Sequence, residues 1–211
     1  MFRFIKDNSY TVFKMFVNQI GMTFLGLVLT MATANYDKWF LASSIFASVF
    51  YMVLLYTMTW EAGYEHSRKI DAGRMDLRPL GGLEMSLFAN IINIVLAILV
   101  IIGFYCATSY NFYSGQLDEN GAAILVSDMA QAVGKSPASP VWAVNLFGTS
   151  KTLAVFLNAM YGGIINRFFN YSPWAYIIIV IPSLLVCTLA YYLGAKGVHF
   201  TKFLGEEPKK E

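Results

Sequence analysis

Four long stretches of this 211-residue sequence contain no Asp, Glu, Lys or Arg: residues 15–36, 39–60, 85–117 and 168–195. A helix needs roughly 20 predominantly apolar residues to cross about 30 Å of hydrocarbon, and each stretch is longer than that. A transmembrane β-barrel would instead need short segments of alternating hydrophobicity, which these stretches do not show. The spacing of the charges therefore predicts an all-α fold, a polytopic helical membrane bundle.

The composition agrees with this fold and excludes several kinds of function. Charged residues make up 13% of the chain and hydrophobic residues 57%, whereas soluble domains carry about 25% charged residues. The net charge of +2 is too small to favour nucleic acid as a partner. Cys106 and Cys187 lie in apolar stretches, as small buried hydrophobic residues do. His66 and His199 are separated from any Cys, His or carboxylate cluster, so we expect no metal site.

We expect one domain, residues 1–211, with a bilayer as its environment. Its predicted spans are residues 10–33, 38–60, 83–105 and 174–193. Trp39 and Trp60 bracket the second span, as indole rings do at the two membrane interfaces. Small residues on one face of that span would let the first span approach closely: Ala42, Ser43, Ser44, Ala47 and Ser48. Pro182 predicts a kink in the last span.

The first span has an alternative interpretation. Residues 32–34, Ala-Thr-Ala, have the small-x-small form of a signal-peptide cleavage site. The apolar stretch before them is long, however, and Lys14, Asn18 and Gln19 interrupt its first half. These features favour an uncleaved helix over a signal peptide.

Residues 141–165 are apolar enough to cross a membrane but carry Lys151 near their middle. Lys and Arg concentrate in short cytoplasmic loops, so we expect loop 61–82 to be cytoplasmic. With four spans the polar tail, residues 194–211, is cytoplasmic as well, and most basic residues lie on one side. With five spans the tail moves outside and the asymmetry nearly disappears. This favours four spans, both termini in the cytoplasm, and residues 141–165 as a re-entrant or interfacial helix.

The connection before this helix, residues 107–140, is polar. We expect it to lie on the side of the membrane opposite to loop 61–82, with a short helix at residues 122–133.

Two polar stripes are the candidate functional residues inside the predicted spans. One comprises Asn18, Gln19 and Thr23 on the first span, and the other Ser86, Asn90 and Asn93 on the third. An unpaired amide in hydrocarbon costs several kcal/mol, so these side chains must face protein or water. They either form hydrogen bonds between helices or line a path for a substrate or ion.

Charged residues supply the remaining candidates. If residues 141–165 span the membrane, Lys151 should be paired or functional, because a cation at mid-membrane costs at least about 2.5–3.5 kcal/mol. If they form a re-entrant helix, the Lys151 side chain reaches the interface instead. Glu61 and Glu84 lie at the two ends of loop 61–82. They either form a cation-binding pair or are carboxylates at the membrane interface. The basic residues of that loop are candidates for contact with a partner or an anionic lipid: Arg68, Lys69, Arg74 and Arg78.

Two runs carry a resemblance to a known group of proteins. They are NQIGMTFLGLVL, residues 18–29, and WEAGYEHSRKIDAGRMDLRPLGGLEMSLFANIINI, residues 60–94. Both resemble small multispan membrane proteins of Gram-positive bacteria that have no assigned function. The resemblance covers the first half of the chain, and it implies neither an activity nor functional residues.

The sequence leaves two function hypotheses. The first is a transport-associated protein, either a small carrier or the membrane subunit of a transport complex, since polar stripes accompany a re-entrant segment. The alternative is a non-transporting scaffold or sensor that binds a cytoplasmic partner through loop 61–82. No catalytic constellation is present, so we expect neither an enzyme nor a cofactor.

Overall fold

The computed structural model describes residues 2–74, 76–108, 141–169 and 172–198, and within these residues every element is a helix. Three helical segments are long and apolar enough to cross a membrane: Ser9–Thr33, Asp37–Asp71 and Ala175–Ala195. Gly81–Ala89 and Ile91–Cys106 together would make a fourth. The predicted all-α fold is therefore confirmed, with three helices that could span a membrane. The predicted helix at 122–133, Lys135, His199 and the tail beyond residue 198 lie outside the described residues.

The helices follow one another in a simple order along the chain. The main elements are α1 (Phe2–Asp7), α2 (Ser9–Thr33), α3 (Asp37–Asp71), α4 (Gly81–Ala89), α5 (Ile91–Thr108), α7 (Val141–Leu157), η1 (Ala159–Tyr161), α8 (Gly162–Ile164), the π-helical turn η2 (Ile165–Phe169), α9 (Ala175–Ile178) and α10 (Val180–Ala195).

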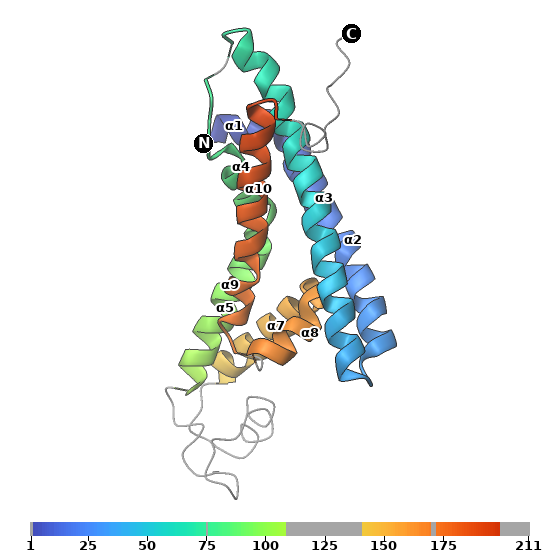
Figure 1. Cartoon of the computed structure of the whole chain (residues 1–211). Helices are drawn as coiled ribbons and strands as arrows, with labels where there is room; N and C mark the ends of the chain where they lie inside the picture. The colour runs from blue at the N-terminus through green and yellow to red at the C-terminus, as the bar shows by residue number, and fades with distance from the viewer. Residues whose placement is uncertain (1, 75, 109–140, 170–171, 199–211) are drawn as a thin grey trace, which may run out of the picture.

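The bundle has the shape of a wedge (Figure 1). At one end, called here the N-terminal end, α1 and the last turns of α3 and α10 lie together. At the opposite end lie the α2–α3 turn, the end of α5 and the start of α9. α3 and α10 pack against each other near the N-terminal end and separate toward the opposite end, where α7 and α8 lie between them.

Glycines allow the close packing at the N-terminal end. A Cβ atom at Gly63 of α3 would collide with the backbone carbonyl oxygen of Tyr191 in α10. A Cβ atom at Gly194 of α10 would collide in turn with the carbonyl oxygen of Trp60. Gly82 of α4 faces the backbone of Cys187 in the same way. Small residues let helix backbones approach closely, so α3, α4 and α10 form one tightly packed unit.

α3 is longer than the predicted span 38–60, because it continues through the first half of the predicted loop 61–82. The buried residues of this extension include Ala62, Gly63 and His66. The imidazole Nδ1 of His66 lies 2.8 Å from the hydroxyl oxygen of Tyr191, a hydrogen bond between α3 and α10. Packing against α10 therefore keeps this charged segment helical.

The predicted third span is not one straight helix. α4 and α5 meet at Asn90 with a bend of 63°. The side-chain Nδ2 of Asn90 donates to the carbonyl oxygen of Ser86 at 3.0 Å, and its backbone has left the helical region, with φ −93° and ψ 10°. Asn side chains compete with the backbone for such hydrogen bonds, which explains a break at this residue.

The last span is interrupted as expected from Pro182. α9 ends at Ile178 and α10 begins at Val180. Proline has no N–H to donate to the carbonyl four residues earlier, which here belongs to Ile178. The hydrogen-bonded ladder therefore breaks at this point.

The small-residue face of α3 packs against two segments, where only one was expected. Ser43 Oγ lies 3.1 Å from Thr33 Oγ1, which joins α3 to α2 as predicted. Ser44 Oγ instead accepts a hydrogen bond from the backbone N–H of Gly163, at 2.8 Å. The face therefore also receives α8, a contact between residues far apart in the sequence.

Substituting Gly63 with Ala should destabilise the protein by about 1–3 kcal/mol, because overpacking forces backbone shifts. Gly21→Ala is the matched control, since a Cβ at Gly21 meets no atom within 4 Å. That variant should be neutral or more stable, by up to about 1 kcal/mol. Unfolding followed by circular dichroism in detergent measures both. Equal stabilities for the two variants would show that close backbone contact does not hold α3 to α10.

Candidate functional site

Four buried polar side chains from three parts of the chain gather inside the bundle, and we call them the polar centre. They are Thr23 of α2, Asn90 and Asn93 at the α4–α5 break, and Asn158 between α7 and η1. None is more than 4% exposed. The predicted stripes on the first and third spans thus contribute to one place, and the segment after α7 adds a residue to it.

The asparagines form a chain of contacts. Asn93 Nδ2 donates to Asn90 Oδ1 at 3.4 Å, and Asn158 Nδ2 donates to Asn93 Oδ1 at 3.5 Å. Asn158 Nδ2 also donates to the carbonyl oxygen of Ala154 at 2.9 Å. The contacts to backbone are of ordinary length, whereas the two contacts between side chains are long for hydrogen bonds. The side-chain contacts are therefore the weaker part of the network.

Two helix interruptions position these residues. Asn90 stands between α4 and α5, and Asn158 stands between α7 and η1 with φ −109° and ψ 26°. Carbonyl groups at such breaks lose their partners within the helix. Thr23 Oγ1 donates to the carbonyl oxygen of Leu157 at 2.8 Å, and it also lies 3.0 Å from the carbonyl oxygen of Gln19. α2 therefore supplies a partner to the end of α7.

The other residues of the predicted stripes lie around this centre. Ser86 is fully buried, and its hydroxyl donates to the carbonyl oxygen of Leu83 at 3.1 Å. Gln19 is buried, and Asn18 is half-buried with its Nδ2 atom lacking a hydrogen-bond partner among the described residues. Ser86 and Gln19 are shielded, as polar groups in apolar spans must be, whereas Asn18 is only half-buried. A role for them in a pathway stays a prediction.

Asn158 was missed by the sequence analysis although the signal was present. It is an amide within an apolar segment, and the reasoning applied to Asn90 and Asn93 applies to it equally. What the sequence did not show is that the end of α7 meets the α4–α5 break.

Lys151 lies on α7 outside the polar centre. Its side chain is half-buried, and its Nζ lies 5.5 Å from the centroid of the Phe147 ring, within the range of a cation–π contact. It precedes Asn158 by about two helical turns. Lys151 is therefore placed nearer the opposite end of the bundle than the asparagines are.

The basic residues of loop 61–82 are all exposed at the N-terminal end. Arg68, Lys69 and Arg74 line a shallow depression of about 330 Å³ together with Glu65. Arg78 does not line it, and its guanidinium lies 5.2 Å from the ring centroid of Phe4. Three of the four predicted contact residues thus share one surface.

The two carboxylates that flank the loop have different surroundings. Glu61 forms an ion pair with Lys14 of α2, with 3.6 Å between Oε2 and Nζ. One carboxylate oxygen of Glu84 is buried without a hydrogen-bond partner in the described part of the chain. Among the described residues no group of three or more His, Cys, Asp and Glu is placed to hold a metal ion.

Comparison with known proteins does not identify a family for this chain. No protein-family model, no curated protein and no solved structure matches this chain. The resemblance to unassigned membrane proteins of Gram-positive bacteria therefore remains an expectation, and function is argued from the geometry of the polar centre.

Proposed function

We propose that this protein is transport-associated, either a small carrier or the membrane subunit of a transport complex, and that a solute or ion passes at the polar centre. One observation carries the proposal. Two interrupted helical segments, α4–α5 and α7–η1, meet at asparagines in the interior of an apolar bundle. Irregular backbone at membrane depth is tolerated where it is buried in protein or lines a water-filled cavity, and transporters build binding sites from such broken helices.

A four-span topology fits this proposal. In it α2, α3, the α4–α5 pair and α9–α10 cross the membrane, and the segment from α7 to η2 is re-entrant. Three contacts support a segment that begins and ends on the same side of the membrane. Phe147 of α7 packs against Gly103 near the end of α5, Gly163 bonds to Ser44 near the start of α3, and the indole of Trp174 donates to the hydroxyl of Tyr105 at 3.0 Å.

Tryptophan positions support the placement of the bilayer. Trp39 and Trp60 are 21 residues apart on α3, or about 32 Å at 1.5 Å per residue. This matches a hydrocarbon thickness of about 30 Å. Trp39, Trp142 and Trp174 are exposed at the opposite end, where an interface would be. Thr23 precedes the end of α2 by about 15 Å, which supports a polar centre near the midplane in this topology.

Basic residues support the orientation. In the described part of the chain, the N-terminal end carries Lys6, Lys14, Arg68, Lys69, Arg74, Arg78 and Lys196. Arg3 belongs to α1 at the same end, and the remaining basic residues of the described part are Lys38, Lys151 and Arg167. An excess of Lys and Arg marks the cytoplasmic side, so the N-terminal end is proposed to be cytoplasmic, with both termini there.

The chemistry of the polar centre indicates what it would carry. Its four side chains are uncharged amides and a hydroxyl, which supply both hydrogen-bond donors and acceptors. The long contacts between the asparagines would open at little cost, leaving these groups to replace the hydration shell of a passing molecule. A small neutral polar solute or a small monovalent cation fits such a centre better than an anion does.

The scaffold hypothesis remains the second candidate, and one observation favours it. Arg68, Lys69 and Arg74 are exposed and line the same depression, so a partner with an acidic surface could bind there. Such a partner would be cytoplasmic in the proposed orientation. Under the scaffold hypothesis the helices serve as an anchor, and the polar centre has only a structural role.

The topology is tested by thiol labelling in a Cys106→Ser, Cys187→Ala background. Asp71→Cys and Lys196→Cys should react with a membrane-impermeant maleimide only in inside-out vesicles, because both exposed positions lie at the N-terminal end. Tyr36→Cys, in the α2–α3 turn, should react only in intact cells. Labelling of Lys196→Cys from the same side as Tyr36→Cys would establish five spans and contradict the re-entrant segment.

Transport is tested in liposomes that contain the purified protein. The wild-type protein should raise the flux of at least one of glycerol, urea, Na⁺ or K⁺ above that of protein-free liposomes. Asn93→Leu should return the flux to the baseline, because it removes a donor and an acceptor from the polar centre. Asn145→Leu is the matched control, since Asn145 is exposed on α7, and its flux should stay at the wild-type level.

If no flux is seen, purification from the native membrane in mild detergent distinguishes the transport hypothesis from the scaffold hypothesis. A stoichiometric transport partner whose activity is lost with Asn93→Leu supports the membrane-subunit form of the proposal. A cytoplasmic partner that is released by reversing Arg68, Lys69 and Arg74 to Glu, and is unaffected by Asn93→Leu, would contradict transport and support the scaffold.

A further inference from the structure

His66 is a buried histidine at the N-terminal end of the bundle. It lies six residues past Trp60 on α3, or about 9 Å beyond the proposed edge of the hydrocarbon layer, and is 4% exposed. Its Nδ1 atom lies 2.8 Å from the hydroxyl oxygen of Tyr191. A tyrosine hydroxyl both donates and accepts, so this hydrogen bond can form with either charge state of the imidazole. Protonation of His66 therefore changes chiefly the cost of keeping the ring buried.

α1 covers this histidine with one aromatic side chain. The centroid of the Phe4 ring lies 5.7 Å from that of the His66 imidazole and 6.2 Å from that of the Tyr191 ring. Phe4 is 5% exposed, and a Cβ atom at Gly81 of α4 would come within 2.9 Å of its ring. Phe4 thus completes an aromatic cluster with α3, α4 and α10.

α1 is the part of this cluster that is held least firmly. It has six residues, Phe2–Asp7, whereas an isolated helix is marginally stable only above roughly 12–15 residues. It is separated from α2 at Asn8, where φ is −110° and ψ is 18°, outside the helical region. The glycine contacts described above join α3, α4 and α10 much more closely. When the buried imidazole becomes costly, α1 is therefore the element that moves.

The electrostatic surroundings disfavour a proton on His66. Burial is the largest influence on the pKa of His66 and lowers it from the usual value of about 6.5. The Lys69 ammonium lowers the pKa further, whereas the carboxylates of Glu65 and Asp7 raise it. The charged and titratable groups around His66 and its hydrogen-bond partner come from four parts of the chain: Asp7 of α1, Glu65 and Lys69 of α3, Glu84 of α4 with Arg78 before it, and Tyr191 of α10.

We propose that α1 is a pH-sensitive cover over His66: α1 stays docked while the imidazole is neutral and is released when the imidazole is protonated. The docked state has the lower His66 pKa, and release of α1 exposes the ring and returns its pKa toward about 6.5. Docking is therefore strongest above about pH 6.5 and weakens as the pH falls from there through the pKa of the docked state. This response does not depend on transport at the polar centre.

The position of α1 is measured by double electron–electron resonance between nitroxide labels on Lys6→Cys and Lys196→Cys, in phosphatidylcholine nanodiscs and in the Cys106→Ser, Cys187→Ala background. Both labelled positions are exposed, one on α1 and the other at the end of α10. We expect one narrow distance distribution at about pH 8 and an additional broad component at about pH 5. Labels on Asp71→Cys and Lys196→Cys are the control, and their distribution should not change because α3 and α10 stay packed.

Four variants assign the response. His66→Gln keeps a hydrogen-bonding side chain that does not titrate, so it should give the narrow distribution at both pH values. His199→Gln, at the only other histidine of the sequence, should respond like the wild type. Lys69→Gln removes a cation that disfavours the imidazolium, so its release should require a lower pH. Phe4→Ala should show the broad component already at about pH 8, because it removes the ring that holds α1 on the cluster.

Two results would overturn the proposal directly. One is a wild-type distribution that is the same at both pH values. The other is a response that persists in His66→Gln, since the response would then come from a carboxylate such as Asp7 or Glu65. If His66→Gln is already released at about pH 8, Lys69→Gln decides the question. A release midpoint that does not move in that variant shows that His66 does not control α1.

Discussion

A helix that ends inside hydrocarbon must find protein partners for its free carbonyl and N–H groups, because no water is there to supply them. This constraint explains why the two interruptions of this bundle lie together. The break at Asn90 and the break at Asn158 are joined through Asn93, and Thr23 of α2 satisfies the carbonyl of Leu157 at the end of α7. The Leu157 carbonyl depends on Thr23, whereas the backbone N–H and carbonyl of Asn90 are paired within their own segment, with Ser86 and Ile94. The polar centre is thus both the structural solution for the broken helices and the best candidate for a pathway.

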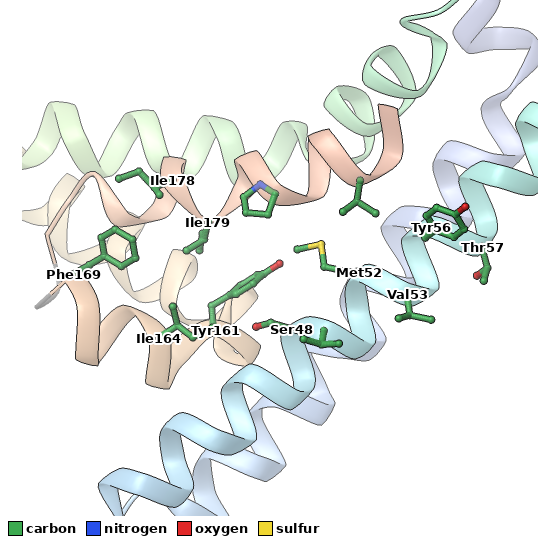
Figure 2. A pocket seen from close by; sticks show the side chains of 13 residues that line it. Ser48, Met52, Val53, Tyr56, Thr57, Tyr161, Ile164, Phe169, Ile178 and Ile179 are labelled. Carbon is green, nitrogen blue, oxygen red and sulfur yellow. The ribbon is translucent and has the colours of Figure 1, made fainter. Parts of the chain in front are cut away.

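Glycine contacts set the wedge shape that makes room for these elements. Gly63 and Gly194 bring the backbones of α3 and α10 together at the N-terminal end, and the helices then separate. Gly26 lets the backbone around Met160 pack directly on α2, and Gly163 lets the same segment pack on the backbone of Phe40 in α3. The segment from α7 to η2 lies in the gap, and an apolar cavity of about 880 Å³ remains beside it (Figure 2). The polar centre and the cavity therefore both follow from helices that converge at one end and separate at the other.

The sequence was sufficient for the features that depend on local composition. Charge-free stretches predicted α2 and the last span within a few residues, and the burial of Asn90 and Asn93 followed from the cost of exposed amides. Features that depend on contacts between distant residues were not predictable in this way. The helical extension to Asp71 comes from packing on α10, and the meeting of Asn158 with Asn93 comes from the path of the chain after α7.

The most direct test is cross-linking of Asn93→Cys with Asn158→Cys by a short bifunctional thiol reagent, in membranes and in a Cys106→Ser, Cys187→Ala background. The two asparagine side chains lie in contact, so the pair should cross-link rapidly. Asn93→Cys with Asn145→Cys should not, because Asn145 lies more than three helical turns earlier on α7. If the first pair fails to cross-link while both cysteines react singly, or if both pairs react equally, then α7 does not end at the α4–α5 break and the polar centre does not exist in the membrane.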